Sequence, residues 1–405
     1  MECLKKLFNK ILKVFKIKTI IKSNTFPLNK SFHNYKYPIN YKISLKDFKI
    51  IKQIGKGSFG KVYLVYSKNL NEYFAMKVLN KKFISLEDQE EHTKTERFIL
   101  EKINNPFIIS LKFSFQTQKN LFLITDFVNG GEIYHLLQEK GKFSEELTKF
   151  YICELIIALK HLHKNKIIYR DLKPENILIN EDGHIKLCDF GLSKILNPYS
   201  ISLSAFSYSE IKNTYKNNTK AFTLCGTKDY LAPEVVVGKG YDKNVDWWSL
   251  GILMYEMLTG ILPFTEENKN SNKINIQKYN NKIFKHSALN NDNYDLICKL
   301  LQLNPKKRLS DDKIKDHVYF RDVNWDLVYN KKIKPPFIPI IKNEFDISNF
   351  DPMFTDINSY AFDEENEYDN NNRNNNSNSL DKKKIEMQEF DYYNFDYINN
   401  KYIES

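Results

Sequence analysis

Apolar and polar positions alternate along the first part of the chain, and longer apolar stripes with a helical period follow. KVYLVY and FAMKVL, within residues 48–79, alternate as half-buried strands do, and SLKFSFQT and LFLITDFV predict two more strands. A helix is predicted over 85–103, opened by Ser85 and acidic in its first turn. Residues 145–164 and 246–258 predict long, largely buried helices. This order indicates an α+β fold in which a small strand-rich lobe and a larger helical lobe enclose a cleft.

Three stretches lack any such period. Residues 1–47 are basic and irregular, 195–220 are rich in Ser, Asn and Tyr, and 369–379 read DNNNRNNNSNS. A segment with few apolar side chains cannot bury enough surface to offset the lost chain entropy, so we expect disorder over 369–379.

Composition restricts the class of protein. The 405 residues are 42% hydrophobic and 14% aromatic, enough to bury a large core. The formal net charge is +11, but Lys is over-used together with Asn, Ile, Tyr and Phe all along the chain, so we expect no basic face and no nucleic-acid partner. The five cysteines include no CxxC pair, and no apolar run reaches 18 residues. These features predict a reducing, cytoplasmic location without a disulfide framework, zinc site or transmembrane helix.

The segment IGKGSFGKV (54–62) places Gly55, Gly57 and Gly60 between two predicted strands. In a dinucleotide-binding fold, glycines at this spacing open a helix, so their position argues against that fold. A glycine-rich hairpin suits backbone N–H groups that close over phosphates.

A fixed order of motifs follows this hairpin. Lys77 stands in AMKV, Glu96 in the predicted helix, Asp171 in RDLKPEN and Asp189 in CDFG, and APE follows at 232–234. With these motifs in this order the chain resembles the eukaryotic protein kinases. The resemblance implies the two-lobed kinase fold, with a small antiparallel sheet and one main helix in the first lobe.

The resemblance also implies a domain organisation. A basic, amphipathic extension (1–47) precedes a catalytic domain (48–320), and a tail (321–405) contains the Asn-rich segment. Within the catalytic domain, about 197–218 forms an insertion in the activation loop. Ordering some twenty extra residues costs at least about 1 kcal/mol each, so we expect this insertion to be disordered.

ATP and Mg²⁺ are the cofactors that the resemblance implies, since phosphoryl transfer needs positioning and charge neutralisation. Lys77 is expected to hold the α- and β-phosphates, aimed by an ion pair with Glu96. Asp189 and Asn176 are expected to bind Mg²⁺ through hard oxygen ligands. The expected ATP-binding residues are Ile54, Gly55, Lys56, Gly57, Ser58, Phe59, Gly60, Lys61, Val62, Lys77, Asp126 and Val128.

The remaining catalytic positions concern the acceptor. Asp171 is expected to accept the proton of the substrate hydroxyl or to orient that hydroxyl, and Lys173 to neutralise the γ-phosphate. A surface-turn carboxylate is the ordinary alternative for Asp171 or Asp189 taken alone. A catalytically weak, kinase-like docking protein, recruited to a membrane or calmodulin by the amino-terminal helix, is the alternative function.

Several stretches narrow the resemblance to the AGC serine/threonine kinases, near protein kinase B and the serum/glucocorticoid-regulated kinases. They are YRDLKPEN, HTKTERFILEKINNPFI, TLCGTKDYLAPE and NWDLVYNKKIKPPF. Thr227 matches a threonine that bridges Asp171 and Lys173, which implies transfer to Ser or Thr of protein substrates. Glu132, Glu175 and Glu256 imply a preference for substrates with basic residues near the target; ordinary helix-start or ion-pair glutamates are the alternative.

The resemblance implies two regulatory devices. Thr223 matches the activation-loop site phosphorylated by an upstream kinase, and His92, Arg170 and Lys194 match the residues that clamp the phosphate.

The tail carries the second device. NFDPMF (349–354) implies that Phe350 lies against the adenine cleft. In YYNFDY (392–397), Tyr392 and Phe395 are expected to anchor on the small lobe near Phe115 and residues 86–98. Asp396 stands where relatives carry a phosphorylated Ser or Thr. An aromatic-rich disordered end is the alternative for this segment.

Residues 1–22 place Leu4, Leu7 and Ile11 on one helical stripe, with lysines over most of the remainder. Three partners stay open for this helix. It suits an anionic membrane, to which the protein would then be peripheral, a calmodulin-like groove, or the kinase core itself.

Overall fold

A computed structural model describes residues 43–57, 60–87, 89–196, 220–264, 283–356, 387, 390–394 and 397. The chain divides into two units, 1–42 and 43–405, and only the second contains described residues. The predictions for 1–22, 197–218, 369–379 and Asp396 therefore lie outside the described residues.

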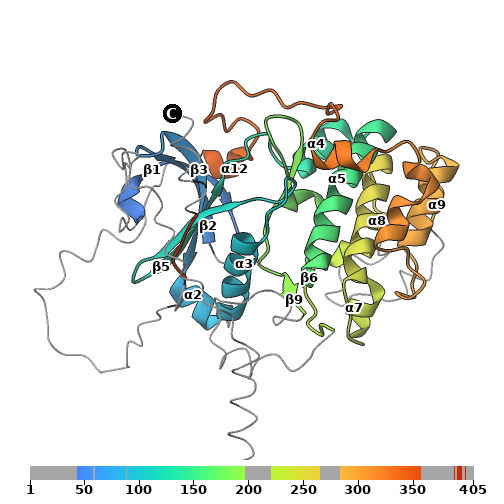
Figure 1. Cartoon of the computed structure of the whole chain (residues 1–405), viewed down its shortest axis with the longest axis horizontal. Helices are drawn as coiled ribbons and strands as arrows, with labels where there is room; N and C mark the ends of the chain where they lie inside the picture. Colours follow the sequence, from blue (N-terminus) through green and yellow to red (C-terminus); the bar gives the residue numbers. More distant parts are fainter. Residues whose placement is uncertain are drawn as a thin grey trace, which may run out of the picture. The chain divides into compact units, whose positions relative to one another are not determined.

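Six strands form the sheet of the first lobe, in the order β1-β2-β3-β5-β4-β10, and every neighbouring pair is antiparallel (Figure 1). The four stretches that alternate in the sequence lie in β2, β3, β4 and β5. The strands are β1 (Phe48–Lys56), β2 (Gly60–Ser67), β3 (Glu72–Asn80), β4 (Leu111–Gln116), β5 (Asn120–Asp126) and β10 (Tyr392–Tyr393).

Two helices, not one, follow β3. The prediction of a single helix opening at Ser85 is wrong, because α2 (Lys81–Leu86) and α3 (Glu90–Lys102) are separate. The side chain of Asn80 accepts hydrogen bonds from the first N–H groups of α2, and asparagine is among the strongest residues at such a cap. The cap starts α2 four residues before Ser85. The chain leaves the helical path beyond Leu86, and α3 carries Glu96.

The second lobe is built on two buried helices, α5 (Glu145–Lys164) and α8 (Asn244–Thr259), which pack against each other (Figure 1). The predicted helix 145–164 coincides with α5, and 246–258 lies within α8. Trp247 and Trp248 of α8 are fully buried. In the described part of the chain, no helix is long and apolar enough to cross a membrane.

Shorter elements surround these two helices. Two small two-stranded sheets, β6 with β9 and β7 with β8, carry the loops of the site. The further elements are η1 (Leu45–Asp47), α4 (Ile133–Lys140), β6 (Ile167–Ile168), η2 (Pro174–Asn176), β7 (Ile177–Ile179), β8 (Ile185–Leu187), β9 (Lys194–Ile195), η4 (Lys228–Tyr230), α7 (Pro233–Val237), α9 (Asn291–Leu300), α10 (Asp312–Lys315), η6 (Val318–Phe320), α11 (Trp325–Tyr329) and α12 (Pro352–Thr355).

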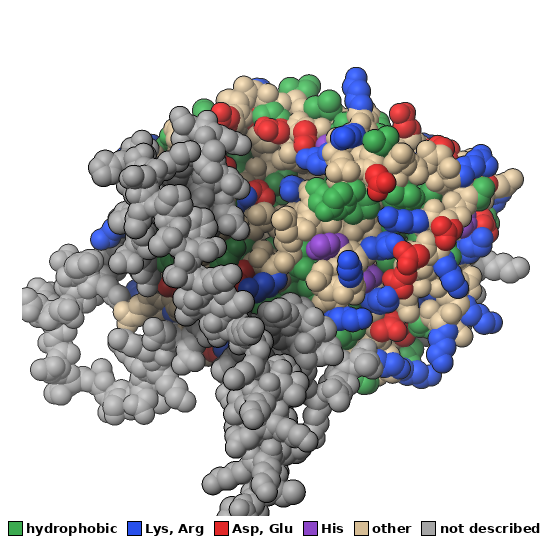
Figure 2. Space-filling view, viewed as in Figure 1, with side chains coloured by type: hydrophobic (Ala, Val, Ile, Leu, Met, Phe, Trp, Pro, Cys, Tyr) green, Lys and Arg blue, Asp and Glu red, His purple; other side chains and the backbone are tan. Residues whose placement is uncertain are grey.

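The carboxyl-terminal segments return to the first lobe. Helix α12 packs against β1, and β10 adds a strand to the edge of the sheet beside β4. The predicted α+β fold, with a small antiparallel sheet and a larger helical lobe, is confirmed. On the face drawn in Figure 2, acidic and basic side chains are interspersed over the helical lobe rather than gathered by sign.

Candidate active site

A cavity of about 580 Å³ lies between the sheet and the helical lobe, a size typical of small-molecule sites. Strands β1, β2, β3 and β5 form one wall, and the loops after β6 and β8 form the other. Of the residues expected to bind ATP, those that line it are Ile54, Gly55, Lys56, Gly57, Gly60, Val62, Lys77, Asp126 and Val128. Lys61 is not among the lining residues, and Ser58 and Phe59 lie outside the described part.

The glycine hairpin is held closed by its backbone, with the N–H of Gly57 donating to the carbonyl of Gly60 at 2.9 Å. Gly60 is required by packing, because a Cβ there would stand 2.1 Å from the carbonyl oxygen of Val78. Gly57, which lines the cavity, has open space on its Cβ side.

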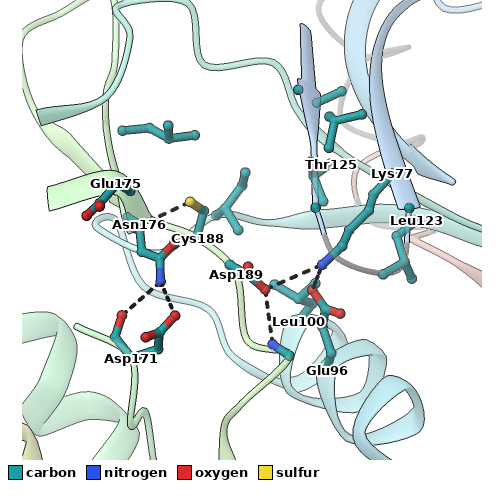
Figure 3. Close-up of a pocket in the computed structure, with 18 of the residues that line it drawn as sticks. Lys77, Glu96, Leu100, Leu123, Thr125, Asp171, Glu175, Asn176, Cys188 and Asp189 are labelled. Atoms are coloured by element: carbon teal, nitrogen blue, oxygen red, sulfur yellow. Dashed lines mark hydrogen bonds and ion pairs between the residues drawn. The ribbon is translucent and has the colours of Figure 1, made fainter. Parts of the chain in front are cut away.

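Three charged side chains from distant parts of the sequence meet in this cavity (Figure 3). Lys77 on β3 places its Nζ 2.7 Å from Oε1 of Glu96 on α3 and 3.4 Å from Oδ1 of Asp189. Burial lowers the pKa of Lys77, but Asp189 and Glu96 together raise it above its ordinary value. The ammonium therefore stays charged.

The two carboxyl groups differ in their surroundings. Lys77 lowers the pKa of Asp189, although burial opposes it, and the N–H of Gly191 adds a hydrogen bond of 3.2 Å. Burial raises the pKa of Glu96, against the attraction of Lys77. Asp189 has a left-handed backbone (φ 51°), while the next side chain, Phe190, is fully buried. This conformation turns the Asp189 carboxylate toward the cavity.

Asp171 lies on the other wall, in the loop after β6. Its Oδ1 accepts hydrogen bonds from the N–H and the hydroxyl of Thr227 at 3.1 and 3.0 Å. Its Oδ2 lies 3.0 Å from Nζ of Lys173 and 2.8 Å from Nδ2 of Asn176. Lys173 also donates to the Thr227 hydroxyl at 2.9 Å. The structure thus places Thr227 between Asp171 and Lys173.

The set of oxygen donors fits a magnesium ion. Nδ2 of Asn176 makes both hydrogen bonds to Asp171, so its Oδ1 is the atom that remains for a metal. The Asp189 carboxylate lines the same cavity as Asn176 and stays ionised. Hard oxygens of this kind are the ligands that Mg²⁺ prefers.

Two residues that support the loop were missed by sequence reasoning. The buried carboxylate of Asp246 on α8 accepts from the backbone N–H groups of Tyr169 and Arg170 at 3.0 and 2.8 Å. His163 contacts the same carboxylate at 2.7 Å. The signal was an acidic residue at the start of an otherwise apolar helix, since a buried carboxylate needs partners.

Residues 48–320 match the family described as the protein kinase domain. This chain belongs to the protein kinase family. The RAC family serine/threonine-protein kinase homolog of Dictyostelium discoideum is 45% identical over 320 residues, which cover 78% of this chain and 67% of that protein. Serine/threonine-protein kinase YPK2/YKR2 of Saccharomyces cerevisiae is 43% identical over 330 residues, or 80% of this chain and 45% of that protein.

Serine/threonine-protein kinase SCH9 of Candida albicans is 45% identical over 329 residues, covering 79% of this chain and 39% of that protein. The chain therefore spans about two thirds of the first relative and less than half of the other two. The predicted resemblance to the AGC serine/threonine kinases is confirmed. A protein kinase domain uses ATP and acts on protein substrates.

The kinase has an acidic region beside Asp171. Glu132 and Glu175 line the cavity, and Glu256 accepts a hydrogen bond from the Tyr230 hydroxyl. Burial, Glu175 and Asp351 raise the pKa of Glu132 to about 7. Burial also raises the pKa of Glu256, and Glu175 adds to that effect. Of the three glutamates singled out in the sequence, Glu175 thus lies close enough to influence both Glu132 and Glu256.

The expected phosphate clamp of the kinase is also gathered in space. Burial lowers the pKa of His92, and the nearby charges of Arg170 and Lys194 lower it further. His92 belongs to α3, Arg170 to the loop of Asp171, and Lys194 to β9. Thr223 is exposed on the segment that leads to Thr227.

The tail of the kinase supports both the cavity and the sheet. Phe350 lines the cavity and stacks on Phe127, with ring centroids 5.8 Å apart. Sequence reasoning missed Met387 and Phe390, which at 2% exposed are the most buried side chains among the described tail residues. Tyr392 is only half-buried and lies under Arg97 of α3, while Phe395 and Asp396 are outside the described residues.

Proposed function

We propose that this chain is an ATP- and Mg²⁺-dependent protein serine/threonine kinase that transfers the γ-phosphate to Ser or Thr of protein substrates. The observation that supports this most strongly is the convergence of Lys77, Glu96 and Asp189 with Asp171 and Asn176 around one cavity. These positions are the ones that phosphoryl transfer requires.

Lys77 has the role of holding the α- and β-phosphates. Its ammonium is fixed by Glu96, so little reorganisation is needed when a triphosphate binds. Asp189 and Asn176 would hold Mg²⁺, which neutralises phosphate charge when bound. The glycine hairpin would close over the phosphates, and the backbone of Asp126 and Val128, which line the cavity beside Thr125, would contact the adenine.

Asp171 has the role of orienting the acceptor hydroxyl and taking its proton. Thr227 and Asn176 fix the orientation of its carboxylate in the wall of the cavity, where an acceptor hydroxyl would bind. Lys173, 3.0 Å from the same carboxylate, is placed to neutralise charge on the transferred phosphoryl group. Thr227 belongs to the activation segment, the stretch from Asp189 to Glu234. The position of this segment therefore affects the Asp171 carboxylate directly.

The acidic region favours substrates with Arg or Lys near the target residue. The charge of Glu175 raises the pKa of both Glu132 and Glu256, and a cationic side chain bound here would relieve this repulsion. Activation is proposed to follow phosphorylation of Thr223 by an upstream kinase, with His92, Arg170 and Lys194 as the clamp. A membrane or calmodulin-like partner for residues 1–22 and a cytoplasmic location remain predictions.

The test is transfer of labelled phosphate from Mg·ATP to a basic Ser peptide by the wild type and by Asp171→Asn. We expect the variant to lose about 10²- to 10⁴-fold in kcat, the range for a positioned general base. The exposed Asp322→Asn, whose carboxylate pairs with Lys149, is the matched control and should keep its activity. If the wild type with phosphorylated Thr223 transfers no phosphate, the alternative of a docking protein is the correct one.

A further inference from the structure

Tyr241, in the connection between α7 and α8, contacts both Arg170 and Thr223, which are far apart in the sequence. The residue is buried, and its hydroxyl accepts a hydrogen bond from Nη1 of Arg170 at 3.0 Å. The same hydroxyl donates to the backbone carbonyl of Thr223 at 2.7 Å. Two backbone hydrogen bonds of 2.8 Å between Tyr241 and Ala221 fix the same contact.

The phenol has one proton to donate, and here its acceptor and donor functions are both used. Burial raises the pKa of Tyr241 to about 12, although Arg170 opposes the shift. The hydroxyl therefore keeps the proton with which it binds Thr223. Gly240 allows the close approach, because a Cβ at this position would stand 2.5 Å from the ring of Phe222.

Arg170 extends the connection to the segment that follows Asp189. Its guanidinium donates to the carbonyls of Leu192 and Ser193 as well as to Tyr241. Its backbone N–H is held by Asp246, and its neighbour is Asp171. One guanidinium thus holds the catalytic loop, the start of the activation segment and, through Tyr241, the end of that segment.

The contact to Thr223 uses the backbone carbonyl and not the side chain, so it does not require a phosphate. We propose that Tyr241 is a positioning residue that holds the activation segment against Arg170 when Thr223 is unphosphorylated, and so maintains a basal activity. The proposal rests on the proposed kinase function. The position of the activation segment affects catalysis because Thr227, four residues beyond Thr223, donates a hydrogen bond to the Asp171 carboxylate at 3.0 Å.

The test compares Tyr241→Phe with the wild type in two states. One state is a Thr223→Ala background, which keeps the backbone carbonyl but cannot accept a phosphate. The other is the full chain with Thr223 phosphorylated, in which phosphate oxygens give Arg170 a second way to hold the segment. We expect Tyr241→Phe to lower kcat about tenfold in the first state, from the loss of a charged hydrogen bond, and less than about threefold in the second.

Tyr255→Phe is the matched control, because it removes another buried hydroxyl whose bond, to the carbonyl of Phe284 at 3.1 Å, lies away from the activation segment. It should lower kcat equally little in both states. An equal loss in both states for Tyr241→Phe, or no loss in either, would overturn the proposal. The rate of hydrogen exchange at the Ala221 amide gives a second measurement. We expect this rate to be higher in Tyr241→Phe than in the wild type. An inactive phosphorylated wild type would instead refute the kinase function itself.

Discussion

Single residues in the site could be named from the sequence where a motif fixes them. Lys77, Asp171 and Asp189 stand in motifs whose order alone indicated their shared chemistry, and the structure brings them to one cavity. Asp246 and Tyr241 could not be named in this way. Asp246 contacts Arg170, more than seventy positions away in the sequence, and Tyr241 contacts Thr223, about twenty positions away. A single sequence does not show which distant residues are in contact.

Glu132 gives a prediction at the same scale, because its pKa of about 7 lies well above its ordinary value of 4.5. The carboxyl is largely protonated at pH 6 and largely ionised at pH 8. Since only the ionised form attracts a cation, the KM for a peptide with an upstream Arg should fall roughly fivefold between pH 6 and pH 8, as expected for a partly exposed ion pair.

Steady-state kinetics across this pH range provide the measurement, with a peptide lacking the Arg to correct for changes in the chemical step. Glu132→Gln should abolish the fall in KM, whereas Glu139→Gln, an exposed glutamate of α4, should retain it. A pH dependence that survives in Glu132→Gln would show that another group is responsible.

At the scale of elements, periodic stretches were predicted well and short or long-range ones were not. Helix α5 and the four central strands were predicted from the spacing of apolar residues alone. This spacing is regular because each of these elements buries one face against the core. The separate helix α2 was missed, since the Asn80 cap that starts it lies outside the predicted helical stretch 85–103. β10 was missed because a strand of two residues has no period, and its stability depends on pairing with β4.

Docking of the tail on the first lobe leads to a prediction of its own. Phe390 is 2% exposed, and its carbonyl accepts from Oγ of Ser114 at 2.6 Å. Phe390→Ala should lower the free energy of unfolding by about 3 kcal/mol, as for other buried Phe side chains. Urea denaturation checks this against Phe83→Ala, a 58% exposed control that should change stability by less than about 0.5 kcal/mol. Equal effects of the two substitutions would show that the tail is not docked.

For unit 43–405 as a whole, the two lobes share one continuous cluster of buried apolar side chains, from Leu79 and Phe98 in the first lobe to Trp247 in the second. This core fixes the two walls of the cavity, so that Lys77 faces the loop of Asp171 across it. The lobes and the cleft were predicted from the order of the elements. The mutual placement of the walls was implied only by family resemblance, because no local pattern encodes it.

The most direct test of this arrangement is a crystal structure of the chain with Mg²⁺ and a non-hydrolysable ATP analogue. We predict a phosphate oxygen at about 2.7–2.9 Å from Nζ of Lys77, and a metal ion at about 2.0–2.1 Å from oxygens of Asp189 and Asn176. The adenine should lie between the glycine hairpin and Thr125. A nucleotide bound elsewhere, or one whose phosphates lie away from Lys77 and Asp189, would contradict the proposed function.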